Sequence, residues 1–125
     1  MTPSPYVIPG IEITKQVIKE LILKRFPNVE PEKLNTPIRK REYVMCRAFL
    51  MAFLRMTTNE STTKIGAPFN RDHCTVLHNF SMIICLYETD KETKRTMDYL
   101  LNVCLVDPTR FEKFKMDSQR LKVRN

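Results

Sequence analysis

The 125 residues contain only two glycines, and this scarcity constrains the fold more than any other feature of the sequence. Glycine supplies the positive φ angles of tight turns, so a protein built from many short strands and turns needs more of it. Residues that favour helices, namely Leu, Ile, Met, Lys, Arg and Glu, are common instead. The sequence therefore predicts an all-α fold, and its length suits a single domain around one core.

The spacing of apolar residues indicates where the helices lie. Apolar side chains recur every three or four residues in stretches that are separated by Pro27, Pro37, Pro68 and Pro108. We expect five or six helices, over residues 11–26, 39–56, 61–67 and 72–88 and after a capping box at 89–92, with a short helical turn over 31–34. Residues 48–54 are apolar nearly all round, so this segment should be the buried centre of the domain.

Composition divides the chain into three segments. Residues 1–10 contain three prolines and are expected to form an irregular arm. Residues 11–107 should be the helical domain, with a helix-turn-helix at about 61–88. The last segment, 108–125, is a basic tail that carries six basic and two acidic residues, a net charge of +4. The arm and the tail are candidate sites for a protein partner, while the oligomeric state leaves no signal in the sequence.

The charge of the whole chain limits the classes of partner. A net charge of +7 and a pI near 9.4 imply an anionic partner: nucleic acid, an acidic protein or an anionic membrane surface. The most apolar stretch, 44–54, is interrupted by Arg47 and is about half the length that crosses a bilayer. Residues 1–10 do not resemble a secretory signal. We therefore expect a cytoplasmic protein with reduced, buried cysteines rather than disulfides.

The order of the central elements is typical of a helix-turn-helix. A short helix with Ser61 as its expected N-cap is followed by a turn and by a longer helix that Asp72 or Asn70 can cap. The longer helix begins with polar residues, 72–75, and continues with apolar ones, so its first turn can project from a packed support. Short polar side chains suit base edges in the major groove, and the basic residues between 39 and 47 suit phosphates.

The residues of this central region also resemble a known family. The run Arg71-Asp72-His73-Cys74-Thr75-Val76-Leu77-His78 is similar to the signature of the C-terminal DNA-binding domain of DnaA, the bacterial replication initiator. Upstream, residues 41–47 resemble the family's basic-loop-into-helix segment, and residues 64–69 resemble its first reader helix and turn. The resemblance covers about 18–104, most of the chain. An eight-residue motif behind two further matching segments is a specific signal.

The resemblance implies roles for individual residues. Arg39 occupies the position of a minor-groove arginine, Arg47 and Arg55 occupy phosphate-contacting positions, and the major-groove positions fall on Arg71, Asp72, His73 and Thr75. With the neighbouring polar and basic side chains added, the predicted DNA-binding residues are Arg39, Lys40, Arg41, Arg47, Arg55, Thr63, Arg71, Asp72, His73, Cys74 and Thr75.

Four departures from the family pattern fall at or near these positions. Cys74 replaces a Ser or Thr, which exchanges a hydroxyl for a weakly bonding thiol. Asn70 replaces two glycines, Ala48 replaces a glutamine, and Thr63 replaces a proline. One lost base contact costs about 1–3 kcal/mol, which is enough to change the preferred site. The resemblance thus implies DNA binding but not the initiator's own recognition sequence.

Each of these residues also has a simpler interpretation. Asp72 can serve only as a helix N-cap, His73 as a surface residue, and the basic residues of 39–47 and of the tail as solvated charged segments. A zinc site formed by His73, Cys74, His78 and Cys85 is disfavoured, because only Cys74 and His78 have ligand-like spacing.

Taken together, these observations predict a non-enzymatic protein that binds double-stranded DNA sequence-selectively and acts in replication or transcriptional regulation. No cofactor or metal is expected. The chain contains no G-x-x-x-x-G-K-[ST] phosphate loop, so no ATPase activity is expected either. Two alternatives remain: a non-specific architectural DNA binder, and a protein-interaction adaptor that has kept the fold.

Overall fold

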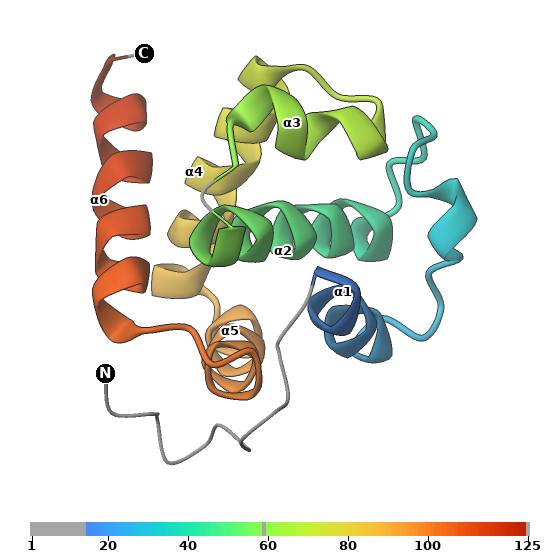
Figure 1. Ribbon diagram of the computed structural model, residues 1–125, viewed down its shortest axis with the longest axis horizontal. Coiled ribbons are helices and arrows are strands. Elements are labelled where there is room, and N and C mark those ends of the chain that lie inside the picture. The colour runs from blue at the N-terminus through green and yellow to red at the C-terminus, as the bar shows by residue number, and fades with distance from the viewer. Residues whose placement is uncertain (1–14, 59, 125) are drawn as a thin grey trace.

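The chain folds into a set of packed helices (Figure 1). The computed structural model describes residues 15–58 and 60–124, and this range contains no strand. The elements within it are α1 (Lys15–Lys24), η1 (Pro31–Lys33), α2 (Arg41–Thr58), α3 (Thr62–Gly66), η2 (Ala67–Phe69), α4 (His73–Thr89), α5 (Lys91–Val103) and α6 (Pro108–Arg124). The predicted all-α fold is confirmed. The arm predicted over residues 1–10 lies outside the described residues.

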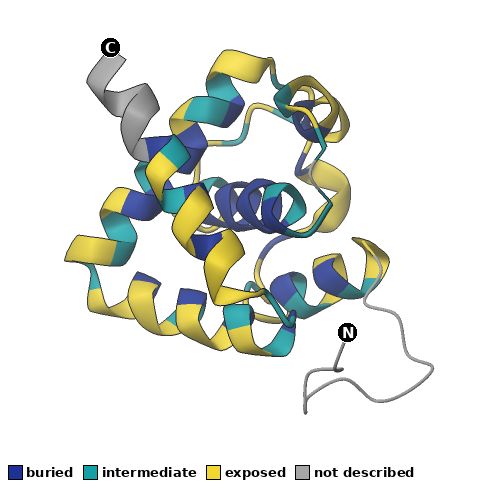
Figure 2. Ribbon diagram, turned by 60° about the vertical axis from the view of Figure 1, so that its left-hand side comes forward, coloured by how far each residue is buried: buried dark blue, intermediate teal, exposed yellow. Residues whose placement is uncertain are grey.

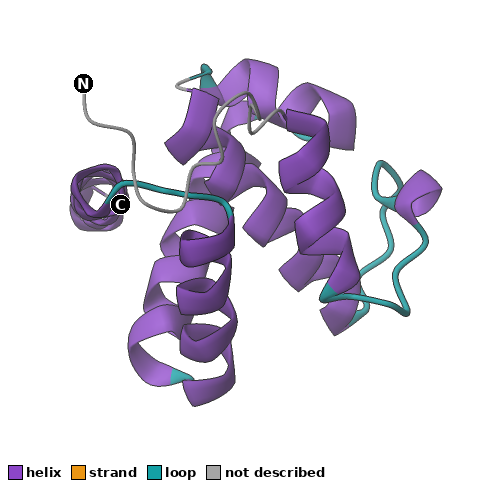
Figure 3. Ribbon diagram, turned by 60° about the horizontal axis from the view of Figure 1, so that its bottom comes forward, coloured by secondary structure: helices purple, strands orange, loops and turns teal. Residues whose placement is uncertain are grey.

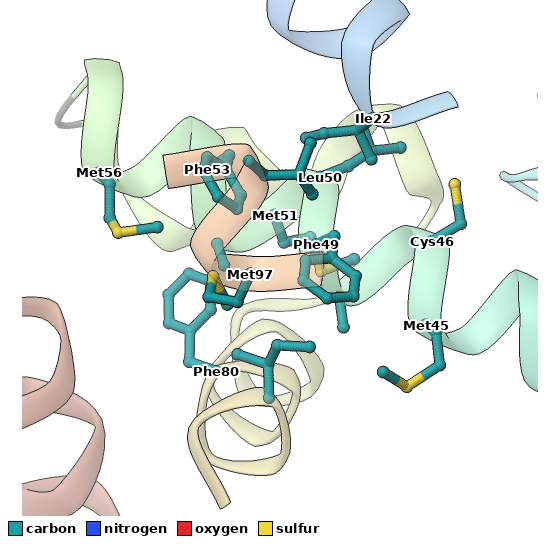
Figure 4. Packing of buried hydrophobic residues seen from close by; sticks show 14 of the residues in the cluster. Ile22, Met45, Cys46, Phe49, Leu50, Met51, Phe53, Met56, Phe80 and Met97 are labelled. Carbon is teal, nitrogen blue, oxygen red and sulfur yellow. The ribbon is translucent and has the colours of Figure 1, made fainter. Parts of the chain in front are cut away.

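Helix α2 forms the centre of the domain. Every residue from Met45 to Phe53 is buried, and α1 and α4 pack against this helix (Figure 2). Met97 of α5 and Phe80 of α4 lie beside the α2 side chains in the same cluster (Figure 4). A helix that is apolar nearly all round must be covered on all sides, which explains why its neighbours surround it. The predicted buried centre at 48–54 is confirmed for 48–53, and Leu54 is half-buried.

Side-chain caps set the beginnings of three helices. Ser61 Oγ accepts the N–H of Lys64 at 3.2 Å, as predicted for the N-cap of α3. The capping box predicted to open at Thr89 is wrong by one residue: Asp90 is the N-cap of α5, and its Oδ2 accepts the N–H of Thr93 at 3.0 Å. Thr89 is instead the last residue of α4, where its hydroxyl donates to the carbonyl of Cys85 one turn earlier.

Residues 108–118 belong to the packed domain rather than to a separate tail. Helix α6, which Figure 3 shows nearly end-on at the side of the domain, packs against α4, with Phe111 and Phe114 buried. The Phe114 ring lies 5.0 Å from that of Phe80, and the Phe111 ring lies 5.2 Å from that of Tyr87, both edge to face. The predicted domain boundary at residue 107 is therefore wrong: aromatic residues hidden within a basic segment attach α6 to the core.

The cysteines were expected to be reduced and buried. All four cysteines are free; Cys46 and Cys104 are buried as expected, whereas Cys74 and Cys85 are exposed. Burial raises the pKa of Cys46 to about 12 and that of Cys104 to about 11.

Across the described range, no helix combines the length and the hydropathy that crossing a bilayer requires.

The turn between α3 and α4 depends on a close backbone approach at Gly66. The Gly66 carbonyl accepts the N–H of Arg71 at 3.0 Å. A Cβ at position 66 would lie 2.4 Å from the Arg71 carbonyl oxygen and 2.8 Å from Cγ2 of Val76. Asn70 completes the turn with a φ of 56°, a left-handed conformation that Asn tolerates better than most residues. Gly66 and Asn70 together set the position of α4 relative to α3.

Replacing Gly66 by alanine is expected to destabilise the fold. The added Cβ meets backbone and a buried valine, so the turn must open, at a cost of about 1–3 kcal/mol in the free energy of unfolding. Thr63→Ala in the same short helix is the matched control, since Thr63 is exposed and its removal should change stability by less than about 0.5 kcal/mol. Urea unfolding followed by circular dichroism measures both variants. Equal stability of the two variants would contradict the close approach.

Candidate nucleic-acid interface

The first turn of α4 projects from the domain, as the sequence predicted. Asp72, His73 and Cys74 are exposed and Thr75 is half-buried, whereas Val76 is fully buried. From Val76 onward, one face of the helix packs on α2 and holds the exposed turn in place. The His73 Nε2 atom lies 3.5 Å from the Cys74 sulfur, so these two side chains share one side of the tip. The tip therefore combines donors and acceptors on a rigid support.

Asp72 acts as the N-cap of this helix. Its Oδ1 accepts the backbone N–H of Thr75 at 2.8 Å. This backbone hydrogen bond is the main reason that the pKa of Asp72 lies below its ordinary value, with smaller contributions from the Thr75 hydroxyl and the charge of His73. Of the two predicted caps, Asp72 and Asn70, it is Asp72 that caps α4, and this residue is exposed beside His73.

Arg47 lies in the interior, where the structure corrects its predicted role in contacting phosphates. Its side chain is only 4% exposed. Nε donates to the carbonyl of Leu34, Nη1 to that of Ile38 and Nη2 to that of Thr36, each at 2.8 Å. Burial, and secondly the charge of Arg71, lower the pKa of the Arg47 guanidinium. The three nitrogens therefore shape the chain segment 34–40, hereafter the basic loop, and a phosphate cannot reach them without displacing it.

Arg71 reaches the same loop from the other side. Its Nη2 donates to the Thr36 carbonyl at 2.7 Å, and its Nη1 donates to the Phe69 carbonyl at 2.7 Å. The Thr36 carbonyl thus accepts from Arg47 of α2 and from Arg71 of the helix-turn-helix. Arg71 was predicted to contact bases in the major groove, but its guanidinium is directed at the basic loop. These two arginines join the loop to the recognition end of α4.

The other predicted residues fall into two groups. Arg39 and Lys40 are exposed at the end of the basic loop, and Thr63 is exposed on α3. Arg41 is exposed and follows Lys40 directly, but it borders the same pocket as Asp90. Asp90 follows the last residue of α4. Because α4 has 17 residues, Asp90 lies about 25 Å along the helix axis from His73. The structure therefore does not bring Arg41 to the recognition end of α4.

Arg55 is half-buried near the end of α2, on the side of the domain away from the basic loop. Its Nη1 donates to the carbonyl of Glu60 at 2.6 Å. Its predicted phosphate contact stays a prediction. Among the described residues, no three His, Cys, Asp or Glu side chains gather as a metal site requires.

Sequence reasoning missed the structural roles of Gly66 and Arg47. A signal for Arg47 was present, since it is the charged residue within the most apolar stretch of the chain. A buried charge needs several hydrogen-bond partners, so such a residue is better explained as a buried donor than as a surface contact. Gly66 is one of only two glycines, which also marked it as a position with a special backbone requirement.

Removal of the Arg47 side chain is expected to destabilise the whole domain. Arg47→Ala removes the guanidinium donor from the carbonyls of Leu34 and Ile38 and leaves the Thr36 carbonyl with Arg71 alone, so it should lower the free energy of unfolding by about 2–4 kcal/mol. Arg47→Lys should recover only part of this loss, because an ammonium does not reproduce the planar fork of donors. Arg39→Ala, at an exposed position of the same loop, is the control and should change stability by less than about 0.5 kcal/mol. Chemical unfolding distinguishes the three variants; equal losses in Arg47→Ala and Arg39→Ala would contradict the buried role.

The cap formed by Asp72 should make stability depend on pH. Its folded pKa is lowered, so its contribution is present above the pKa of aspartate in the unfolded chain and is lost as the pH falls through the folded value. Asp72→Ala is expected to lower the melting temperature at pH 7 and to have little effect at the lowest pH that preserves the fold. Asp72→Asn is the control, because asparagine caps without ionising. Equal melting temperatures of the two variants at pH 7 would count against the cap.

Comparison with known proteins identifies the family of the chain. A family model described as the bacterial dnaA protein helix-turn-helix matches residues 15–83, which include α1 to α3 and the first part of α4. No solved structure matches the chain.

Several curated relatives are named chromosomal replication initiator protein DnaA. The chain is 33% identical to that of Flavobacterium psychrophilum over 88 residues, covering 70% of this chain and 18% of the relative. It is 33% identical to that of Streptococcus mutans over 102 residues, covering 81% and 21%. It is 34% identical to that of Thermus thermophilus over 95 residues, covering 75% and 20%. The chain thus spans about a fifth of the length of these relatives, and it belongs to the bacterial DnaA helix-turn-helix family.

Proposed function

We propose that this protein binds double-stranded DNA sequence-selectively and without catalysis, with the first turn of α4 in the major groove. The observation that carries the proposal is the exposed tip formed by Asp72, His73 and Cys74, whose helix is buried from Val76 onward. In a helix-turn-helix, the N-terminal residues of the recognition helix contact base edges in the major groove while the rest of the domain holds that helix in place. Membership of a helix-turn-helix family supports the same use of α4.

His73, Cys74 and Thr75 are the proposed base-contacting residues. An imidazole and a hydroxyl both donate and accept hydrogen bonds, so they can distinguish base pairs by the groups in the major groove. The thiol of Cys74 bonds only weakly, so it should contribute to the fit more than to hydrogen bonding. Asp72 orients this turn through its cap and presents its remaining carboxylate oxygen to the groove.

Arg39 and Lys40 are proposed to contact the DNA backbone or the minor groove. They extend from the basic loop, which Arg47 and Arg71 attach to the recognition end. Contacts to phosphates position a protein on the duplex but carry no sequence information. The curated relatives are named as replication initiators, so a role in replication or in transcriptional regulation is part of this proposal.

Selection from a random duplex pool, followed by a salt titration of the selected site, tests the proposal. Sequence-selective binding should give a consensus, and the logarithm of its affinity should fall linearly with the logarithm of the salt concentration. A steep salt dependence without a consensus would replace the proposal with architectural binding. Absence of duplex binding even at low salt would favour a protein-interaction adaptor.

Two substitutions should separate base contacts from phosphate contacts. His73→Ala is expected to relax the preference at about one or two base pairs and to leave the salt slope unchanged. Lys40→Ala should weaken all duplexes similarly and reduce the slope by about one. His78→Ala is the matched control: it is exposed on the same helix, but five residues turn it about 140° away. If His73→Ala and Lys40→Ala behave alike, the division of roles is wrong.

A further inference from the structure

A pocket beside the helix-turn-helix gathers basic side chains from distant parts of the sequence. It has a volume of about 250 Å³ and lies between the end of α2, the first turns of α4 and helix α6. Arg55, Arg110 and Lys113 line it together with one acidic residue, Asp117, so its charged lining is +3 and −1, a net +2. Arg110 and Lys113 are exposed, so the pocket opens to the surface.

The two arginines of this pocket are held in place by the backbone. Nη1 of Arg55 donates to the Glu60 carbonyl at 2.6 Å, and Nη1 of Arg110 lies 3.2 Å from the Met56 carbonyl and 3.4 Å from that of Thr57. These bonds use only one nitrogen of each guanidinium. Within the described residues no hydrogen bond occupies the Nη2 atoms, so each arginine retains donors for an external acceptor.

The position of the pocket relative to α4 indicates which acceptor it meets. Leu77, one turn after His73 on the same face of α4, forms part of the lining. The basic loop and α6 lie on opposite sides of the α3–α4 pair (Figures 1 and 3). The major groove is about 12 Å wide and a helix with its side chains about 10–12 Å, so elements on both flanks of an inserted helix approach the phosphates that border the groove.

We propose that this pocket binds a DNA backbone phosphate on the flank of α4 opposite the basic loop. The inference rests on the proposed function and extends it, because it adds Arg110 and Lys113 to the phosphate contact that the resemblance implies for Arg55, and so places α6 in the DNA-binding surface. Guanidinium groups bind phosphate oxygens through paired donors, and Lys113 adds a mobile charge at the rim. Asp117 opposes the anion and limits its affinity.

Lys113→Ala tests this site with little risk to the fold, because Lys113 is exposed. It should reduce affinity for every duplex about five- to tenfold at 0.1 M salt and lower the salt slope by about one. Asp117→Asn should increase affinity, since it removes the repelling charge. Lys91→Ala is the matched control: Lys91 is an exposed lysine that follows the end of α4 remote from His73, and its loss should change neither quantity.

Phosphate ethylation interference identifies the contact itself. Lys40 and the pocket should contact phosphates on opposite strands. Ethylation of the phosphate that the pocket contacts should weaken binding by the wild-type protein. The same ethylation should have no further effect on the Lys113→Ala variant. The site is overturned if the wild-type protein binds duplex and Lys40→Ala weakens it, while Lys113→Ala matches Lys91→Ala. Absence of duplex binding by the wild-type protein overturns the proposed function itself. The two failures are therefore distinguishable.

Discussion

The Thr36 carbonyl and the two arginines that donate to it connect the parts of the candidate interface. Arg47 comes from the central helix α2, Arg71 precedes the recognition helix α4, and Thr36 lies in the basic loop. Leu34 and Ile38 pack this loop against the core, and the two arginines fix the direction of its carbonyls. A buried guanidinium that satisfies three carbonyls keeps the loop in one conformation, because each unpaired carbonyl would cost free energy. The spacing between the proposed groove contacts therefore depends on side chains that themselves need not touch DNA.

The rest of the fold supports the recognition helix in a similar way. Helix α2 is buried from Met45 to Phe53 and forms the surface on which α4 packs. The absence of a side chain at Gly66 allows the backbone of α3 to approach Arg71, and helix α6 covers another side of α4 through Phe111 and Phe114. A rigid scaffold matters because a hydrogen bond to a base edge is lost when its donor shifts by a fraction of its length.

The positive charges of the protein do not all have the same role. Arg47 is a buried structural cation, Arg41 lies near the start of α5, and Arg39 and Lys40 extend from the basic loop. A third set lies on the opposite flank, where Arg55, Arg110 and Lys113 surround one pocket. Net charge cannot distinguish these roles, since it counts a buried cation such as Arg47 and an exposed one such as Lys40 equally.

The order of the helices before α6, the cap at Ser61 and the exposed first turn of α4 were predictable from the sequence, and Asp72 was one of two candidate caps. They depend on local signals: apolar periodicity over a few turns, N-cap preferences and prolines. Only the tertiary structure revealed that Arg47 is buried, that Arg71 is directed at Thr36, and that Phe111 and Phe114 join α6 to the core. These facts involve residues far apart in the chain. A charged or aromatic side chain looks the same in the sequence whether its partner is water or a segment many residues away, and only packing decides between them.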